Sequence, residues 1–351
     1  MTSPSYDVAI IGGGIVGAAC AAECADAGLS VAVIEAVMIG GGATAAGMGH
    51  VVVMDDSEAQ FALTRYSQIL WNALAPELPR KLEYEASGTI WVAANDDEMS
   101  EVRRKEKFYR AHAVPAAVLD ARALAEAEPN LRPGLTGGLL VPCDSVIYPP
   151  RAAMAIFLNR ARARGAQVYL GRFVTGLPGD GVRLRDESRI TAGIVVNAAG
   201  SWSPALTPGL SVQKRKGHLV ITDRYPNFLR HQLIELGYLK SAHALTADSV
   251  AFNIQPRKTG QLLIGSSRQY GVETSTVDAP VLKQMLQRAL QYMPGLKGLS
   301  ALRAWTGFRA ATPDKLPLIG PLSPRSTANF IWRRDTKDWG SPLRLAPRSC
   351  L

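Results

Sequence analysis

The sequence predicts an α/β protein, α+β overall, with a βαβ domain that is discontinuous in sequence and a second domain built on an antiparallel sheet. Three observations lead to this fold class. A short apolar strand near the N-terminus runs into glycines spaced G-x-G-x-x-G, and a second strand, over 190–196, also ends in a glycine turn. From residue 212 onward, segments alternate polar and apolar residues, as strands of an antiparallel sheet do.

The first of these features is the segment 6–35. Val8–Ile11 is an apolar run typical of a buried parallel strand. The first glycine after it allows a tight turn, the second lets the backbone approach a pyrophosphate, and the third lets the next helix pack close to the sheet. A helix over 18–27 and a strand over 30–34 complete the unit. The motif glycines are Gly12, Gly14 and Gly17.

Glu35 closes the second strand of this unit. A carboxylate there can accept hydrogen bonds from both hydroxyl groups of a ribose. Strand, glycine motif, helix, strand and acid at this spacing predict a Rossmann-like dinucleotide-binding domain; the alternative is a glycine-rich turn in an ordinary βαβ unit. A loop of small residues follows at 39–50, in which Thr44 can cap a helix and meet a phosphate. His50 is either a buried structural histidine or a neighbour of the bound dinucleotide.

The composition is that of a globular protein and excludes several functional classes. The chain has 351 residues and a net charge of +9, but no basic block with interleaved aromatic residues, so nucleic acid is not an expected partner. The four cysteines are scattered, which favours a reducing compartment and predicts neither a disulfide framework nor a metal site. The N-terminal apolar run has no basic residue before it, since the first one is Arg65. We therefore expect a cytoplasmic protein without an integral membrane segment, with peripheral membrane attachment as the weaker alternative.

The middle of the chain predicts surface helices between sheet strands. Residues 60–78 read as an amphipathic helix, and the charged segment 96–112 as a solvated helix that forms surface rather than a binding site. A further helix is expected over 279–293. The dinucleotide-binding domain is expected to comprise 1–85, 145–211 and 300–332, and the substrate domain 86–144 and 212–299.

Five motifs between residues 6 and 332 together resemble the D-amino-acid oxidase family of FAD enzymes, which includes glycine oxidase, sarcosine oxidase and the flavin subunits of D-hydroxyproline dehydrogenase and hydrogen cyanide synthase. The motifs are GGGIVG, GGGATAAGMGH, VVNAAGSW, KGHLVIT and GFRAATPDKLPLIGP. The last is the most specific, because the first is shared by dinucleotide-binding folds in general. One departure is His218, which stands where the family often has glutamine.

The resemblance implies that the cofactor is FAD. Glu35 would hold the adenosine ribose, and the loop from Gly41 to His50 would run beneath the pyrophosphate and isoalloxazine. The strand at Val174 would meet the adenine. The implied cofactor-binding residues are Gly12, Gly14, Ile15, Val16, Gly17, Glu35, Ala36, Gly42, Ala43, Thr44, Gly47, Met48, Gly49, His50, Val174, Ala198, Ala199, Gly200 and Trp202.

Arg309 is the leading candidate for substrate binding. It lies in a segment framed by glycine and proline, where a guanidinium can hold a carboxylate with two hydrogen bonds; the alternative is a structural salt bridge. The resemblance implies that Arg309 binds the carboxylate of an amino acid. It also places Tyr238 among the lid or pocket residues, and we expect His50 to influence the flavin or proton transfer.

These implications define the expected function. The family oxidises the CH–NH bond of small amino or imino acids, of the D-amino acid, glycine, sarcosine or D-hydroxyproline type, by hydride transfer to the flavin. Whether the protein has partner subunits, and whether oxygen or another carrier accepts the electrons, stays open. One alternative is an inactive or cofactor-poor member of the family. The other is an NAD-dependent dehydrogenase, which the second glycine turn and the absence of a continuing parallel βα series disfavour.

The last nineteen residues, 333–351, depart from the family pattern. The resemblance implies a glycine-rich turn and a helix after Trp332, whereas the chain continues with five basic residues and no helical periodicity. With suitable synonymous codons, the neighbouring reading frame gives GHEGLGITTSLGTA, the ending expected for the family. We therefore interpret 333–351 as a frameshifted, truncated ending, and expect weak FAD affinity, low stability and a mobile tail.

Overall fold

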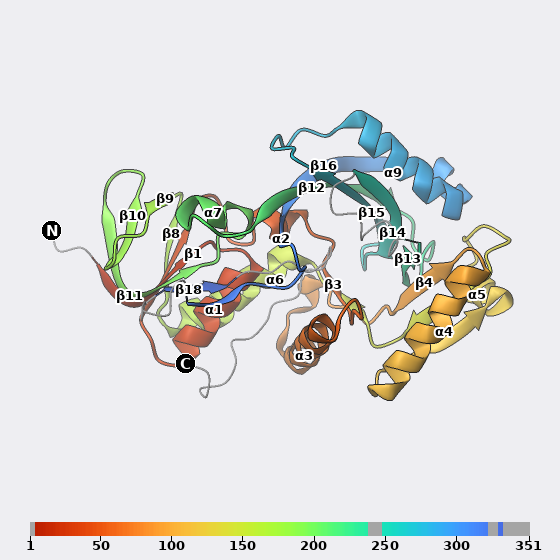
Figure 1. Cartoon of the computed structure of the whole chain (residues 1–351), viewed down its shortest axis with the longest axis horizontal. Coiled ribbons are helices and arrows are strands. Elements are labelled where there is room, and N and C mark those ends of the chain that lie inside the picture. The colour runs from red at the N-terminus through yellow and green to blue at the C-terminus, as the bar shows by residue number, and fades with distance from the viewer. Residues whose placement is uncertain (1–3, 238–247, 322–328, 333–351) are drawn as a thin grey trace.

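The computed structural model describes residues 4–237, 248–321 and 329–332 and contains two large sheets that lie side by side (Figure 1). Tyr238 and the segment 333–351, both singled out in the sequence, lie outside the described residues. The two sheets confirm the expected α/β class with a second, largely antiparallel part. A third, two-stranded sheet consists of β3 (His50–Val51) and β7 (Ser145–Val146), which lie where the chain passes from one large sheet to the other.

The first sheet has a parallel centre in which β1 pairs with both β2 and β11. Helices α1 and α6 cover one face, and the hairpin of β9 and β10 supplies apolar side chains to the other. The strand order is β17-β18-β11-β1-β2-β8. The elements are β1 Ser5–Ile11, α1 Ile15–Asp26, β2 Val31–Glu35, α2 Gly42–Ala46, α6 Pro149–Ile156, β8 Gln167–Leu170, β9 Val174–Gly176, β10 Gly181–Leu184, β11 Arg189–Asn197, α7 Ser203–Leu206, β17 Ile319–Pro321 and β18 Asn329–Trp332.

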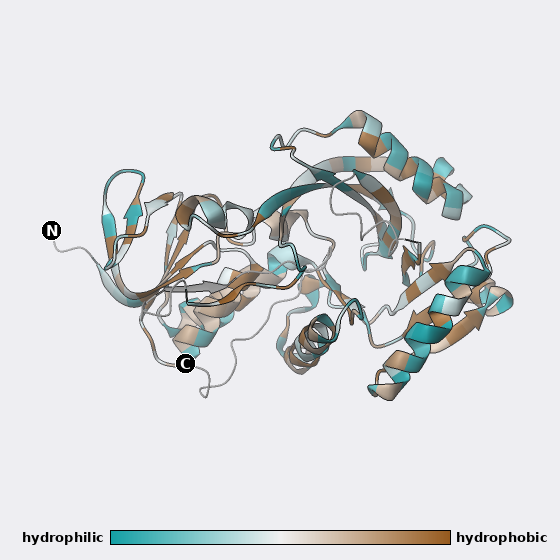
Figure 2. Cartoon of the chain, viewed as in Figure 1, coloured by the Kyte–Doolittle hydropathy of each residue, from teal (hydrophilic) through white to brown (hydrophobic). Residues whose placement is uncertain are grey.

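The second sheet has the order β16-β12-β15-β14-β13-β4-β6-β5 and is antiparallel except at the β13–β4 pair. Helix α9 lies across one of its faces (Figure 1). Hydrophilic and hydrophobic residues alternate along α9 and α4, as in helices that bury one side (Figure 2). The elements are α3 Glu58–Leu74, β4 Thr89–Ala93, α4 Asp96–Ala111, β5 Ala117–Asp120, α5 Ala121–Ala127, β6 Gly137–Val141, β12 Gln213–Arg224, β13 Gln232–Glu235, β14 Ser249–Pro256, β15 Gln261–Tyr270, α9 Ala279–Tyr292 and β16 Ala301–Ala311.

The two glycine turns of the sequence meet at the same edge of the first sheet. Ile11, at the end of β1, is the parallel partner of Asn197, at the end of β11. The turns that follow are in contact, because a Cβ atom on Gly12 would stand 2.6 Å from the carbonyl oxygen of Ala198. The expectation of one βαβ domain assembled from separate segments is therefore confirmed.

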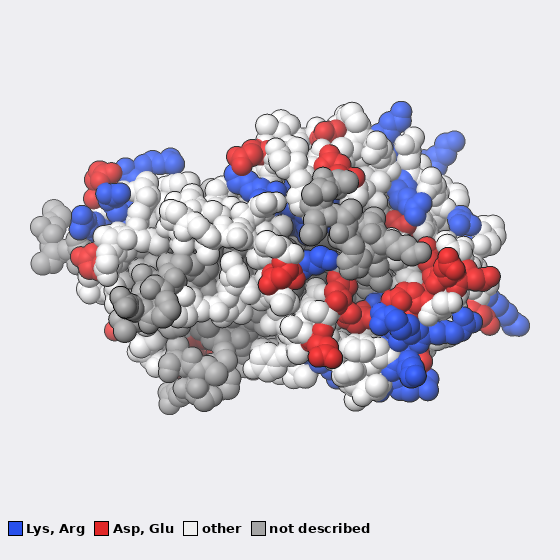
Figure 3. Space-filling model, in the orientation of Figure 1, with Lys and Arg blue, Asp and Glu red and all other residues white. Residues whose placement is uncertain are grey.

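Two expectations need correction. The segment 300–332 does not belong to one sheet: β16 pairs along its length with β12 in the antiparallel sheet, while β17 and β18 join the first sheet. Helix α4 is not purely solvated surface either, since the ammonium group of Lys105 is buried in an ion pair with Asp55. Elsewhere around α4 and α5, acidic and basic side chains are interspersed on the face shown in Figure 3.

Candidate functional site

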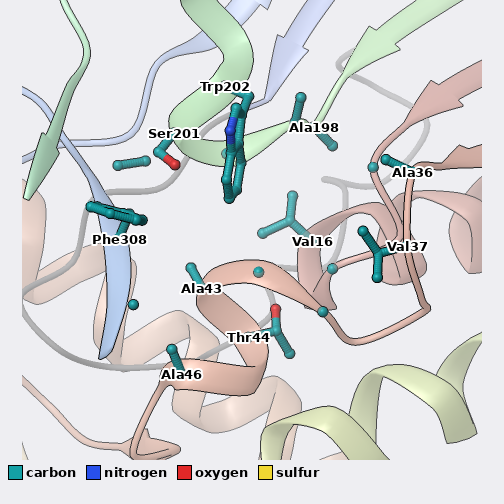
Figure 4. Close-up of a pocket in the computed structure, with 18 of the residues that line it drawn as sticks. Val16, Ala36, Val37, Ala43, Thr44, Ala46, Ala198, Ser201, Trp202 and Phe308 are labelled. Atoms are coloured by element: carbon teal, nitrogen blue, oxygen red, sulfur yellow. The ribbon is translucent and has the colours of Figure 1, made fainter. Parts of the chain in front are cut away.

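A cavity of about 450 Å³ lies beyond the carboxyl ends of β1, β2 and β11 and extends to β12 and β16. Figure 4 shows side chains entering the same space from α1, α2, the segment after β2, the segment after β11 and β16. A crevice at the carboxyl ends of parallel strands is where α/β sheets bind ligands. Of the expected cofactor residues, the lining includes Gly12, Gly14, Ile15, Val16, Glu35, Ala36, Gly42, Ala43, Thr44, Gly47, Met48, Val174, Ala198, Ala199, Gly200 and Trp202.

The glycine motif brings backbone N–H groups to this cavity. Gly17 must lack a side chain, because a Cβ atom there would stand 1.8 Å from the carbonyl oxygen of Gly12. Helix α1 therefore packs against the turn with its N-terminus at the cavity wall. Helix α2 also starts there, and neither N-cap, Gly14 or Gly41, provides a side-chain cap. Two helix N-termini at one cavity, with backbone N–H groups in their first turns, suit the negative charge of a pyrophosphate.

Thr44 is placed differently from the helix cap that the sequence suggests. It lies inside α2, and its hydroxyl Oγ1 accepts a hydrogen bond of 2.9 Å from the backbone N–H of Ile15, in the first turn of α1. Thr44 therefore joins the N-termini of the two helices, and it still lines the cavity.

Glu35 is held by the backbone at the end of β2. Its Oε2 accepts from the N–H of Gly13 at 2.6 Å, and its Oε1 accepts from the N–H of Val37 at 2.8 Å. Each carboxylate oxygen has a second lone pair, so these bonds leave capacity to accept from ribose hydroxyl groups. Among the described residues that line the cavity, Glu35 is the single carboxylate.

From the antiparallel sheet, Arg309 of β16 lines the cavity and extends over the neighbouring strand β12. Its Nη1 donates to the carbonyl oxygen of Ser267 at 3.1 Å, and its guanidinium group lies against Gly217. Met48 and Leu219 lie nearby in an apolar cluster. A cation beside an apolar wall is an arrangement that can hold a carboxylate while burying the rest of a small ligand.

The remaining candidates do not line the cavity. Gly17 and Gly49 allow close approaches of the backbone. Gly49 has φ +86°, and a Cβ there would stand 2.0 Å from the carbonyl oxygen of Ile147. His50 is completely buried in β3, opposite Val146, and is not part of the cavity lining, so a place beside the cofactor stays a prediction.

Sequence reasoning missed several residues of the lining. Arg172 and Phe173 precede the expected Val174, while Gly217, Leu219 and Phe308 reach the cavity from the antiparallel sheet. The strand alternation of KGHLV could have indicated Gly217 and Leu219, because alternate residues of a strand share one face. Which face meets the cavity depends on pairing with β16, which no local pattern reveals.

The residues that line this cavity fit FAD. The two helix N-termini suit its pyrophosphate, the carboxylate of Glu35 suits its ribose, and the apolar side chains of the lining suit a flavin ring and a small substrate. Among the described residues, no cluster of three or more His, Cys, Asp or Glu side chains could hold a metal ion. In the same part of the chain, no helix is long and apolar enough to cross a membrane.

Comparison with known proteins agrees with an FAD site in this cavity. Residues 7–338 match the family model described as FAD dependent oxidoreductase, DAO. The hydrogen cyanide synthase subunit HcnC of Pseudomonas aeruginosa is 27% identical, over 91% of this chain and 85% of its own. The glycine oxidase of Geobacillus kaustophilus is 29% identical, over 90% of this chain and 84% of its own.

Solved structures share the fold. The crystal structure of glycine oxidase from Geobacillus kaustophilus superimposes with a TM-score of 0.85 and 27% identity, covering 96% of this chain and 90% of the other. The L-proline dehydrogenase from P. horikoshii gives a TM-score of 0.82 at 23% identity, covering 95% and 88%, which shows the fold alone.

Proposed function

The chain belongs to the DAO family of FAD-dependent oxidoreductases, and on this premise we propose that it oxidises the CH–NH bond of a small amino or imino acid. The names of its relatives support this substrate class, because they include glycine oxidase and a hydrogen cyanide synthase subunit. The substrate proposed is of the glycine, sarcosine, D-amino acid or D-hydroxyproline type.

The observation that carries this proposal is the position of Arg309. Arg309 lines the cavity from β16 of the antiparallel sheet, whereas Glu35 lines it from the end of β2 in the first sheet. The Nη1 atom of Arg309 donates to the carbonyl oxygen of Ser267, and the planar fork of five N–H donors in a guanidinium group matches the geometry of a carboxylate. A cofactor bound in this cavity would meet the substrate beside Arg309.

The residues of this chain contribute binding and orientation to the reaction. FAD, held by the glycine turns and Glu35, would supply a two-electron acceptor for the hydride of Cα; the neutral amine would become an iminium ion, which water would hydrolyse to a carbonyl compound and a protonated amine or ammonium. Arg309 holds the substrate carboxylate, and the apolar side chains of Met48 and Leu219 limit where Cα can lie. The amine must be neutral, because its lone pair supports the loss of hydride. We assign no side chain as a general base.

The test uses purified protein saturated with FAD. We expect a flavin absorbance spectrum that glycine, sarcosine, D-proline or D-hydroxyproline bleaches without oxygen, and turnover with oxygen or a dye as acceptor. Arg309→Lys keeps the charge but loses the fork, so KM should rise about tenfold or more. A protein that binds FAD but is reduced by none of these amines, or an Arg309→Lys variant with unchanged KM, would overturn the proposal.

We also propose a cytoplasmic location and leave partner subunits open. The three described cysteines, Cys20, Cys24 and Cys143, are free thiols, as a reducing compartment favours. Cell fractionation tests the location, and co-purification with the untagged native protein tests for a partner or electron acceptor.

A further inference from the structure

Arg309 is connected to a histidine that the proposed reaction does not use. His218 lies on β12 and is completely buried, and its side chain contacts Ser267 of β15, the residue whose carbonyl oxygen holds Arg309. The other side of the imidazole meets Asp278, the N-cap of α9. Four residues from four elements thus form one hydrogen-bonded chain from α9 to the candidate substrate site.

The hydrogen bonds fix the tautomer of His218. Nε2 lies 3.0 Å from the backbone nitrogen of Asp278, and a backbone N–H can only donate, so Nε2 accepts. The neutral ring therefore carries its proton on Nδ1, which donates to the hydroxyl oxygen of Ser267 at 2.8 Å. Burial, and then the positive charge of Lys216, lower the pKa of His218 and favour the neutral ring, whereas Asp278 opposes this shift.

Ser267 is held at two points by the same residue. Its hydroxyl oxygen accepts from Nδ1 of His218 and also, at 2.9 Å, from the backbone N–H of His218. This happens where the register between β12 and β15 shifts, between Lys216 and Val220. At such an irregularity the side chain takes part in the pairing of the two strands, so it helps to set the direction of the Ser267 carbonyl group.

We propose that His218 and Ser267 are positioning residues that hold the guanidinium group of Arg309 ready for the substrate carboxylate. This inference rests on the proposed function. A guanidinium held in advance loses less rotational freedom when a carboxylate binds, so the effect should fall on affinity. The alternative is that His218 merely caps the start of α9.

Two substitutions of His218 separate these roles. Asparagine places its amide near the position of Nδ1, so His218→Asn can still donate to Ser267 but loses the acceptor for Asp278. Glutamine reaches toward the position of Nε2, so His218→Gln does the reverse. If Ser267 must be held, the asparagine variant binds carboxylate more tightly than the glutamine variant. If only the start of α9 matters, the order is reversed.

Ser267→Ala removes the hydroxyl group itself, and its neighbour offers a matched control. Ser266 is equally buried, and its hydroxyl has no hydrogen-bond partner among the described residues, so Ser266→Ala makes the same change of size beside the network. We expect Ser267→Ala to weaken carboxylate binding about three- to tenfold, as for one hydrogen bond that orients a charged group, and Ser266→Ala to leave it unchanged.

The measurement uses FAD-saturated protein and two readouts. Calorimetry or the flavin spectrum gives the Kd of 2-furoate, a carboxylate on a five-membered ring that carries no oxidisable Cα–H. Steady-state kinetics give KM and kcat, and we expect KM to change more than kcat. Flavin content and Tm identify any variant that misfolds; the His218→Asn and His218→Gln pair then still tests the inference.

The outcomes are distinct. Equal Kd values for the Ser267→Ala and Ser266→Ala variants, or tighter binding by His218→Gln than by His218→Asn, would overturn the inference while the proposed function stands. A wild-type protein that neither binds 2-furoate nor oxidises an amine would overturn the proposed function, and the inference with it.

Discussion

The guanidinium group of Arg309 rests on the backbone of Gly217, so closely that a Cβ atom at Gly217 would stand 2.3 Å from Nη1 and 2.8 Å from Cζ. Arg309 lies on β16 and Gly217 on the paired strand β12, where Gly217 is the register partner of Gly307. A second close approach, in which a Cβ on Gly307 would stand 2.1 Å from Cβ of Ala46, brings α2 against the same strands. Because Gly217 and Gly307 have no side chains, there is room for the guanidinium group of Arg309 and for α2 against these strands.

Gly217→Ala should displace Arg309 without unfolding the protein. The new methyl group meets the far end of a flexible side chain, which can move, whereas hydrogen bonds to a charged group contribute about 1.5–3 kcal/mol when well placed. We expect KM for the amine to rise about tenfold or more, with kcat less affected. Gly298→Ala is the control, because a Cβ there meets nothing within 4 Å. Similar KM values in the two variants would show that the position of Arg309 does not matter.

Glu35→Gln should weaken FAD binding. The carboxylate accepts N–H bonds from Gly13 and Val37, so an amide would turn its NH2 group toward one of these donors and lose that bond. We expect the Kd for FAD to rise about tenfold, equivalent to about 1.4 kcal/mol, in a fluorescence titration of the FAD-free protein. The exposed Glu77 gives a control of the same chemistry, Glu77→Gln. If both variants bind FAD like the wild type, Glu35 has no role in the cofactor site.

The parts of the site that the sequence could predict are those encoded by local spacing. The glycine motif, the following helix and Glu35 lie within one βαβ unit, so chain geometry alone brings them together. The second glycine turn at Ala198–Gly200 joins them because parallel strands align their carboxyl ends.

The parts that could not be predicted depend on pairing between distant strands. β16 pairs with β12, about ninety residues earlier, and this pairing determines that Gly217 faces Arg309. His50 shows the opposite case: Gly47 and Met48, just before it, line the cavity, but β3 pairs with β7 and the buried His50 is not part of the lining. Lys105 was expected at the surface because a charge run does not reveal a buried Asp55 from another segment.

Lys105→Met should destabilise the fold strongly. The ammonium group is about as buried as Asp55, with which it forms an ion pair, and it also lies 4.9 Å from the centre of the Trp91 ring. Removing the ammonium group leaves the buried carboxylate of Asp55 with the half-exposed Arg104 as its cationic partner among the described residues, so we expect a loss of about 3 kcal/mol in the free energy of unfolding, measured in urea at constant FAD. The double variant Asp55→Asn with Lys105→Met should recover part of this loss. Losses that simply add would show that the two groups do not interact.

Asp144→Asn should change how stability depends on pH. Burial raises the pKa of Asp144 to about 7, against the hydrogen bonds that Oδ1 accepts from Val53 N and Gln68 Nε2. An unfolded aspartate titrates near pH 4, so between about pH 4 and 7 the folded protein holds a proton that the unfolded chain has released. Stability therefore falls as pH rises through this window and stays low above it.

The asparagine variant cannot titrate, so its stability relative to the wild type should be greater at pH 8 than at pH 5. Urea unfolding at both pH values measures this difference, and the absolute stability at one pH is not the criterion, because the amide also alters the hydrogen bonds. Parallel pH dependence in the two proteins would mean that Asp144 does not hold a proton near neutrality.

The last prediction concerns the gene beyond the codon of Trp332. Reading the last base of each codon with the first two of the next gives alanine, one free position and then GHEGLGITTSLGTA, if third bases are chosen among synonymous codons. Many first and second bases in this string are fixed by the protein sequence, so a chance match of this length is improbable. We expect the gene to contain this open frame, and sequencing it decides the matter.

The physical consequence can be measured in the protein. A glycine-rich turn leading into a helix would add backbone N–H groups and a helix N-terminus, which favour the negative charge of a reduced flavin or a phosphate. A variant carrying the second frame after Trp332 should therefore bind FAD more tightly, purify with more yellow colour and oxidise amines faster than the present chain. The control is a tail of equal length in which the GHEGLG turn is replaced by serines. If the gene lacks the frame, or if both tails give the same FAD affinity, the interpretation of 333–351 as a frameshifted segment is wrong.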